Sequence, residues 1–180
     1  MALRKASSYS KKRFVSYTRH SKVKSKAYIK TVPQQKVVKF TMGNAAAFNN
    51  NEFPYILHVK SKNNVLIRDN ALESARVLLT KELDESLPGQ YYFALKVFPH
   101  HILRENKMLT GAGADRMQTG MQLSFGSVVG RAAVVKQGAE IFVFATNNEK
   151  NVAIVRKIIS KIKSKLPCQI SVEFEKIGNI

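Results

Sequence analysis

Hydrophobic and polar residues alternate along several short stretches of the chain, the pattern expected of β-strands with one buried face. The stretch from Tyr91 to Phe98 is apolar on both faces except for Lys96, which predicts the central strand of a sheet. Pro167 precedes the last alternating stretch, which predicts an edge strand. The predicted strands cover residues 36–40, 55–60, 65–67, 91–98, 128–135, 140–145 and 168–174.

Short polar segments between these stretches indicate turns. A turn is predicted at Gly43-Asn44, after the first strand. Residues 62–64 join the second and third strands, so we expect the third to return as the hairpin partner of the second. Residues 136–138 join the next pair in the same way, and we expect that hairpin to pack beside the strand that starts at Tyr91.

Two segments place hydrophobic residues three and four positions apart, the spacing of one face of an α-helix. Asn70 is predicted as the N-cap of the first helix, with Glu73 completing a capping box. The second helix is predicted from Glu149 to Leu166, and its lysines gather near the C-terminus, where the helix dipole favours cations. The predicted buried positions are Leu72, Ala75, Leu79 and Leu83 in the first helix, and Val152, Val155, Ile159, Ile162 and Leu166 in the second.

Together these elements predict an α+β fold in two layers, with two helices packed on one mostly antiparallel sheet. The chain has 180 residues, of which 44% are hydrophobic, enough for one core but hardly for two. We therefore expect a single domain over residues 36–176, preceded by an extended basic arm over residues 1–35. A long glycine-rich internal loop over residues 104–121 is expected to interrupt the domain.

The charge balance indicates a protein that binds a polyanion. Thirty Lys and Arg against 12 Asp and Glu give a net charge of +18, which repels itself without an anionic partner. Nucleic acid and an anionic membrane are the two candidates. No stretch approaches the ~20 apolar residues of a membrane span, and no apolar leader follows Met1. We therefore expect a cytoplasmic protein that binds nucleic acid and no membrane.

The N-terminal arm carries most of this charge. Twelve Lys and Arg lie in residues 1–39, and the first acidic residue is Glu52. Tyr28 and three further aromatic residues alternate with these cations, so rings can stack on unpaired bases while the cations neutralise phosphates. A solvated tail is the alternative, but such a tail has no need of aromatic rings. The predicted RNA contacts of the arm are Arg4, Lys5, Tyr9, Lys11, Lys12, Arg13, Tyr17, Arg19, Lys22, Lys24 and Lys26.

The segment Lys107–Met121 combines three glycines with long flexible side chains and no proline, so little in it fixes one backbone conformation. Arg104, Lys107 and Arg116 lie on or beside this loop and suit contact with a polyanion. A nucleotide-binding turn is one alternative, because Gly111-Ala112-Gly113 begins like the dinucleotide fingerprint, but Arg116 stands where the third glycine belongs. A plain surface loop is the other alternative, although connections of this length are usually functional or disordered.

No pattern of residues indicates a metal site or catalysis. Cys168 is the single cysteine, so it forms neither an intrachain disulfide nor a cysteine-based zinc site. His58 has no second ligand at a useful spacing, and the neighbours His100 and His101 point to opposite sides of an extended segment. We expect one of this pair, assigned to His100, to contact RNA. We expect no cofactor and no enzymatic activity.

Several segments also carry a family resemblance. The longest is Phe98–Gly126, and further agreement lies in Ile67–Arg76, Phe40–Asn44 and Lys165–Pro167. In these segments the chain closely resembles the universal large-subunit ribosomal protein sixteen family, in the archaeal and eukaryotic type called ten-e. The resemblance extends from about Tyr28 to Phe174.

The resemblance implies a structural role in the large ribosomal subunit. Members of this family have a fold described as an α/β hammerhead. They bind large-subunit ribosomal RNA near the base of the central protuberance, between the peptidyl-transferase centre and the elbow of the aminoacyl-site tRNA. The family joins late in subunit assembly, as one copy per ribosome, so the implied partners are ribosomal RNA, transfer RNA, neighbouring ribosomal proteins and assembly factors.

The same resemblance implies roles for particular residues. Arg68 is expected as a basic contact at the start of the first helix, and Arg104 is expected near RNA. The expected tRNA-proximal positions are Lys107, Gly111, Gly113, Arg116, Gln118 and Gly120.

This chain also departs from the family pattern. The family commonly has His where Asp69 stands and Arg in the place of Gln122, so phosphate contacts at these two positions are not carried over. The arm lacks the Pro-rich, Cys-Tyr-Arg beginning of the family, so its path over RNA is not carried over either.

Two other classes of protein remain as alternatives. A nucleotide-dependent enzyme would need a strand directly before Gly111 and a helix directly after Gly113, and the sequence favours neither. An RNA chaperone or a DNA-compacting protein would use the same charge, but it would not need a loop of this particular composition.

Overall fold

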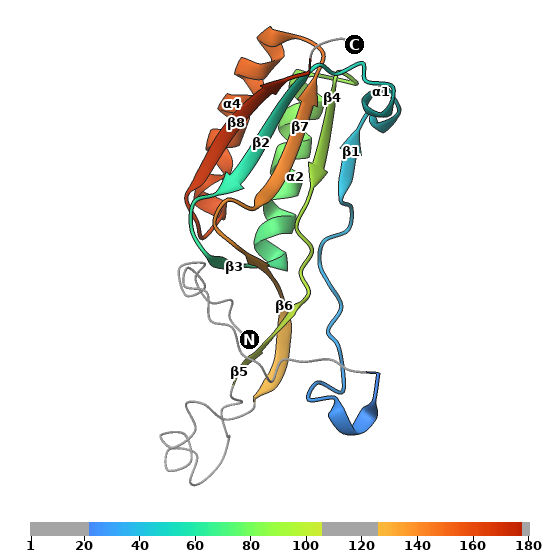
Figure 1. Cartoon of the computed structure of the whole chain (residues 1–180), viewed down its shortest axis with the longest axis vertical. Coiled ribbons are helices and arrows are strands. Elements are labelled where there is room, and N and C mark those ends of the chain that lie inside the picture. Colours follow the sequence, from blue (N-terminus) through green and yellow to red (C-terminus); the bar gives the residue numbers. More distant parts are fainter. Residues whose placement is uncertain (1–21, 106–125, 178–180) are drawn as a thin grey trace.

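The structure, a computed structural model, describes residues 22–105 and 126–177. Every strand pairing in this part of the chain is antiparallel, and the strands form two sheets (Figure 1). The first sheet contains, in spatial order, β1 (Thr41–Gly43), β4 (Tyr91–Leu95), β7 (Glu140–Thr146), β2 (Tyr55–Ser61) and β8 (Ile170–Lys176). The second sheet contains β3 (Val65–Arg68), β6 (Ser127–Val135) and β5 (His101–Glu105).

Two long helices, α2 (Asp69–Ser86) and α4 (Glu149–Ile162), cover one face of the five-stranded sheet (Figure 1). The opposite face is covered at one end by α1 (Ala45–Asn49), whose Phe48 ring stacks on Tyr92 with centroids 4.1 Å apart. Single 3₁₀ turns occur at η3 (Lys24–Lys26) and η4 (Lys163–Lys165). The predicted α+β class with two packed helices is confirmed.

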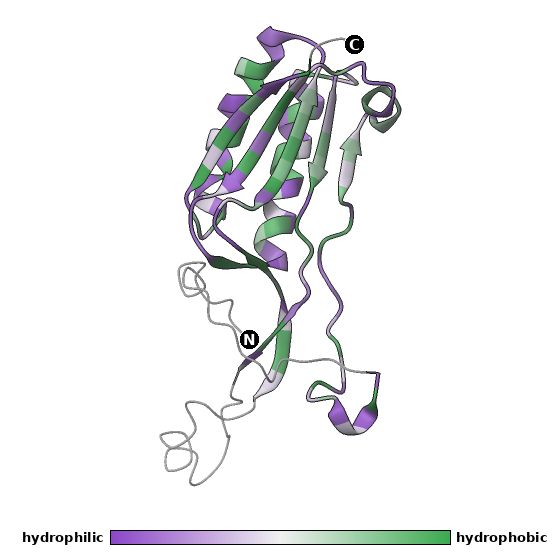
Figure 2. Ribbon diagram, in the orientation of Figure 1, coloured by the Kyte–Doolittle hydropathy of each residue, from purple (hydrophilic) through white to green (hydrophobic). Residues whose placement is uncertain are grey.

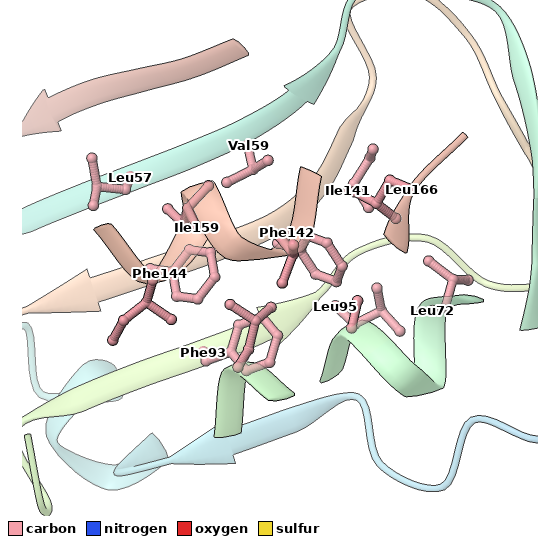
Figure 3. Close-up of a cluster of buried hydrophobic side chains, with 14 of the residues drawn as sticks. Leu57, Val59, Leu72, Phe93, Leu95, Ile141, Phe142, Phe144, Ile159 and Leu166 are labelled. Carbon is pink, nitrogen blue, oxygen red and sulfur yellow. The ribbon is translucent and has the colours of Figure 1, made fainter. Parts of the chain in front are cut away.

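The main core lies between the helices and the five-stranded sheet (Figure 3). Phe93, Phe142 and Phe144 point into it and are at most 1% exposed, and the Phe93 and Phe144 rings stack at 4.7 Å. Figure 2 shows hydrophobic and hydrophilic residues alternating along α2 and α4, as the helical spacing predicted. All nine hydrophobic positions predicted for the two helix faces are buried, but α4 ends at Ile162, before the predicted end at Leu166, which lies beyond η4.

The strand predicted at residues 36–40 is wrong. Its backbone does not join a strand there, because its N–H groups bond to carboxylates on the first turns of α2. The Lys36 N–H donates to Asp69 Oδ2 and the Val38 N–H to Glu73 Oε2, each at 3.3 Å. The first backbone bond to β4 is at Phe40, whose carbonyl accepts from the Leu95 N–H at 2.7 Å, and the paired strand itself begins at Thr41.

The capping box predicted at the start of α2 is also wrong. The helix begins at Asp69, so the predicted N-cap Asn70 already lies inside it. Asp69 Oδ1 accepts a hydrogen bond from the Asn70 N–H at 2.9 Å. Glu73 is occupied by Val38 and by Arg76, whose Nε donates to Glu73 Oε2 at 2.9 Å. This ion pair lowers the pKa of Glu73 and raises that of Arg76.

Neither predicted hairpin forms. β3 pairs with β6 in the second sheet and not with β2, and β6 does not pair with β7. The reason lies in the two turns, which bond to each other. The Gly138 N–H donates to the Ser61 carbonyl at 2.7 Å, and the Ser61 N–H donates to the Ala139 carbonyl at 3.0 Å. The chain therefore passes from one sheet to the other at both turns.

Two strand positions differ in detail from the prediction. β7 and not β4 lies at the centre of the five-stranded sheet, and β4 ends at Leu95, before the exposed Lys96. The last strand, β8, does lie at a sheet edge, as predicted. It begins at Ile170 and not at the predicted Cys168, which lies just before the strand. Cys168 is buried, and burial raises the pKa of its thiol.

Candidate nucleic-acid interface

The second sheet and the N-terminal segment form one end of the molecule. β5 and β6 project away from the five-stranded sheet, and residues 22–40 extend along the same direction to η3 (Figure 1). The two parts are joined by Arg131 of β6, whose Nε donates to the Pro33 carbonyl at 2.6 Å. This bond fixes the N-terminal segment against the strand.

This end is rich in basic residues, and Glu105 at the end of β5 is the one acidic residue in the three described strands of the second sheet. We call residues 22–40, 96–104 and 126–136 the basic end, because these three segments contain ten Lys and Arg and no Asp or Glu. The hydrophilic η3 at its tip is visible in Figure 2. The cations are Lys22, Lys24, Lys26, Lys30, Lys36, Lys39, Lys96, Arg104, Arg131 and Lys136.

The predicted contacts in the described part of the arm are open to solvent. Lys22, Lys24 and Lys26 are all exposed, and the last two lie in η3. Their ammonium groups are therefore accessible to phosphates, as the prediction requires. The remaining predicted arm contacts, from Arg4 to Arg19, lie outside the described residues. So do the predicted loop positions Lys107, Gly111, Gly113, Arg116, Gln118 and Gly120.

Strand pairing brings two of the other predicted contacts onto opposite flanks of β6. Arg68 ends β3 at the start of α2 and pairs with Ala132 of β6. Arg104 lies in β5, opposite Val128, and not in the loop that was predicted to start there. Both side chains are half-buried. The structure thus places Arg68 at the inner end of the second sheet and Arg104 towards its outer end.

The two neighbouring histidines differ as predicted. His100 is exposed, and its ring lies 4.4 Å from that of Phe98, centroid to centroid. His101 is only 9% exposed in β5, and burial, aided by the charge of Arg104, lowers its pKa. His101 is therefore a neutral part of the packing at neutral pH, and His100 is the member of the pair that an RNA can reach.

Six cations of the basic end were not among the predicted contacts, namely Lys30, Lys36, Lys39, Lys96, Arg131 and Lys136. Arg131 is the single cation within the strand from Ser127 to Val135, which is otherwise mostly Val, Ala and Gly. An isolated cation in such a strand is the signal that could have identified it. Its role is to hold Pro33, so it positions the arm in addition to supplying charge.

The face of the five-stranded sheet away from α2 and α4 has the opposite charge. His58 Nδ1 lies 2.9 Å from Glu140 Oε1, and its Nε2 lies 3.2 Å from Glu175 Oε2. Lys60 Nζ lies 2.6 Å from Glu173 Oε2. We call these five residues the acidic patch. His58 Nε2 hydrogen bonds to Glu175 of its own sheet.

Chemically, the cations of the basic end suit electrostatic binding of an anion. Among residues 22–105 and 126–177, no three His, Cys, Asp or Glu side chains gather as metal ligands. No helix within the same ranges is long and apolar enough to span a bilayer. A basic α+β domain with an extended cationic segment is the class of protein that binds nucleic acid through its phosphates.

Comparison with known proteins identifies the family. Residues 13–173 match the family described as ribosomal protein L16p/L10e, and the chain belongs to this family. The resemblance seen in the sequence is thereby confirmed. Because this is a family of ribosomal proteins, the expectation that the chain is not an enzyme is also confirmed.

Curated relatives match almost the whole chain. The large ribosomal subunit protein uL16 of Methanococcus maripaludis is 47% identical over 175 residues, covering 96% of this chain and 95% of the relative. The protein of the same name from Sulfolobus acidocaldarius is 36% identical over 180 residues, covering 99% and 97%. That of Pyrobaculum arsenaticum is 37% identical over 180 residues, covering 99% and 95%.

Proposed function

We propose that this protein is a structural constituent of the large ribosomal subunit, where it binds large-subunit ribosomal RNA. The observation that carries the proposal is the family match over residues 13–173, together with relatives named as large-subunit proteins along nearly their full length. The distribution of charge supports it, because the ten cations of the basic end suit a phosphate backbone.

In the proposed complex, the basic end contacts the RNA in three ways. Lys22, Lys24 and Lys26 on the exposed segment neutralise phosphates, and this fixes register without reading sequence. His100 is exposed beside Phe98 and can hydrogen bond to RNA. Arg68 and Arg104 extend the contact along the second sheet. Shape and backbone contact then dominate recognition, as is usual for folded RNA.

The finer proposal concerns the place of the protein in the particle. It binds near the base of the central protuberance, and the loop at 104–121 reaches towards tRNA near the peptidyl-transferase centre. The contacts assigned to this loop are Lys107, Gly111, Gly113, Arg116, Gln118 and Gly120, all of which lie outside the described residues. We propose one copy per cytoplasmic ribosome, joining late in assembly beside neighbouring ribosomal proteins and assembly factors.

Sedimentation of cell extract on sucrose gradients at low and high salt tests the proposal. We expect the protein to travel with the large subunit and to stay there at moderate salt. A site of ~6 to 10 simple phosphate contacts loses roughly 10³- to 10⁵-fold in affinity between 50 and 200 mM salt. Retention beyond that loss would indicate docking by shape. A protein that stays at the top of the gradient at every salt concentration would overturn the ribosomal role.

A further inference from the structure

A concave pocket lies in the basic end, between the N-terminal segment and the start of β6. Its volume is about 500 Å³, within the roughly 300–1,000 Å³ of small-molecule sites. Residues 28–31 and Pro33 form one side, and residues 126–128 form the other. Nothing in the proposed phosphate contacts accounts for a pocket here.

The walls of this pocket are mainly apolar, and its rim is not. Ile29 is 1% exposed, so this part of the N-terminal segment is packed against the rest of the protein. Tyr28, by contrast, is 57% exposed although it lines the pocket, so its ring is free to receive a partner. Lys30 is exposed beside it and supplies a cation.

The pocket is held open by the fold. The Arg131 Nε to Pro33 carbonyl bond of 2.6 Å ties the N-terminal wall to β6, the strand that provides the other wall. Val128 of that second wall is opposite Arg104 in the second sheet. The two walls are therefore fixed relative to each other in the free chain.

We propose that this pocket binds one unpaired base of the large-subunit ribosomal RNA, stacked on Tyr28, with the adjoining phosphate at Lys30. Apolar walls reject a bare phosphate, and the exposed Lys30 among the lining residues favours an anion. A nucleotide whose base is turned out of the RNA stack combines an aromatic face, which suits the apolar walls, with a phosphate, which suits the cation. This inference rests on the proposed function, because it takes ribosomal RNA as the partner.

The experiment compares large subunits that carry the full-length protein as wild type, Tyr28→Ala, Tyr28→Phe or Phe174→Ala. Phe174 is 44% exposed on β8, far from the pocket in the fold, so its replacement controls for loss of an exposed ring. Subunits are purified on gradients, and the ribosomal RNA is probed with dimethyl sulfate and a 2′-hydroxyl-acylating reagent.

We expect Tyr28→Ala to enter subunits and to raise the reactivity of one unpaired nucleotide. Loss of one stacked base corresponds to about 5- to 150-fold in the local opening equilibrium. Tyr28→Phe should restore protection, and Phe174→Ala should leave it intact.

Several outcomes would overturn the pocket proposal alone. One is Tyr28→Ala entering subunits with no nucleotide changed. Another is Tyr28→Phe behaving like Tyr28→Ala, which would mean that the hydroxyl and not stacking matters. Ultraviolet cross-linking of Tyr28 to a protein and not to RNA would assign the pocket to a protein partner. By contrast, a wild-type chain absent from the subunits would refute the proposed function itself.

Discussion

Gly43 shows how one residue decides whether the edge of the five-stranded sheet can form. Its φ is +79°, and a Cβ placed on it would lie 2.3 Å from the Tyr91 carbonyl oxygen. The neighbouring Asn44 N–H donates to that same oxygen at 2.9 Å. The backbone therefore approaches β4 so closely that only glycine fits.

Gly43→Ala should destabilise the protein more than Gly138→Ala. Both glycines have a φ of +79°, but a Cβ at Gly138 meets nothing within 4 Å. The strained φ costs about 1–2 kcal/mol in each variant, and the clash at Gly43 adds about 1–3 kcal/mol. Urea unfolding of the two variants measures the difference. Equal losses would mean that β1 shifts freely away from Tyr91.

His101 should make stability depend on pH. Its pKa is lowered in the folded protein by burial and by Arg104, so the unfolded chain binds the proton more tightly. The stabilisation is fully present above the unfolded pKa of about 6.5 and is lost as pH falls below it, at up to about 1.4 kcal/mol per pH unit.

Urea unfolding between pH 5 and 7.5 checks this dependence. His101→Gln should flatten the fall in stability, whereas His100→Gln, at the exposed neighbour, should leave it unchanged. A His101→Gln variant with the full wild-type slope would assign the pH dependence to another group.

At the scale of elements, the sequence predicts the helices and strands whose pattern is contained within a short stretch of chain. α2, α4 and the strands at 55–60, 128–135 and 140–145 could be read from periodicity, because burial on one face imposes it directly. Partner choice could not. The turns at Ser61 and Gly138 look like hairpin turns, yet they bond to each other and lead each chain segment into the other sheet.

The segment 36–40 shows the second limit of such prediction. Its pattern suits a strand, but carboxylates of Asp69 and Glu73, more than 30 residues away, bind its N–H groups. In the candidate site, too, local signals could be predicted and long-range contacts could not. Charge identified Lys22, Lys24 and Lys26, while the role of Arg131 depends on where β6 meets Pro33.

Arg131→Ala should loosen the N-terminal segment and leave the core intact. The variant loses the bond to the Pro33 carbonyl, so amides 28–35 should exchange with deuterium faster, while those of β4 and β7 stay protected. Lys136→Ala, at an exposed position just beyond the same strand, is the matched control. Unchanged exchange at 28–35 would show that Ile29 alone anchors the segment.

Across the whole molecule, charge is separated. The basic end holds ten cations, whereas the acidic patch places Glu140, Glu173 and Glu175 on the face of the five-stranded sheet away from α2 and α4. The exposed carboxylates of Glu173 and Glu175 also lie on β8, where charge discourages pairing of an edge strand with another chain. The acidic patch therefore disfavours approach to a polyanion through that face of the sheet.

Replacing Lys22, Lys24 and Lys26 by Gln should release the protein from large subunits at lower salt. Each lost phosphate contact lowers the slope of log affinity against log salt by about 0.7 to 0.9. Up to three contacts are removed here, so salt washes of purified subunits should show a change of about 2 to 3.

The matched control replaces Lys81, Lys150 and Lys176 by Gln, three exposed lysines outside the basic end. It removes the same net charge and should leave the slope unchanged. If both triple variants lose retention equally, total charge and not its position governs binding.

The strand order has a consequence in time. β2 pairs with β7 and β8, and the register joins Lys60 to Glu140, so 80 residues must be added before the first of these partners exists. At about 5–20 residues per second, translation takes about 4–16 seconds to bridge that gap. During this interval the nascent chain carries the apolar β2 with neither neighbour beside it, open to pairing with other chains. β8 is made last and needs only to be added at the edge.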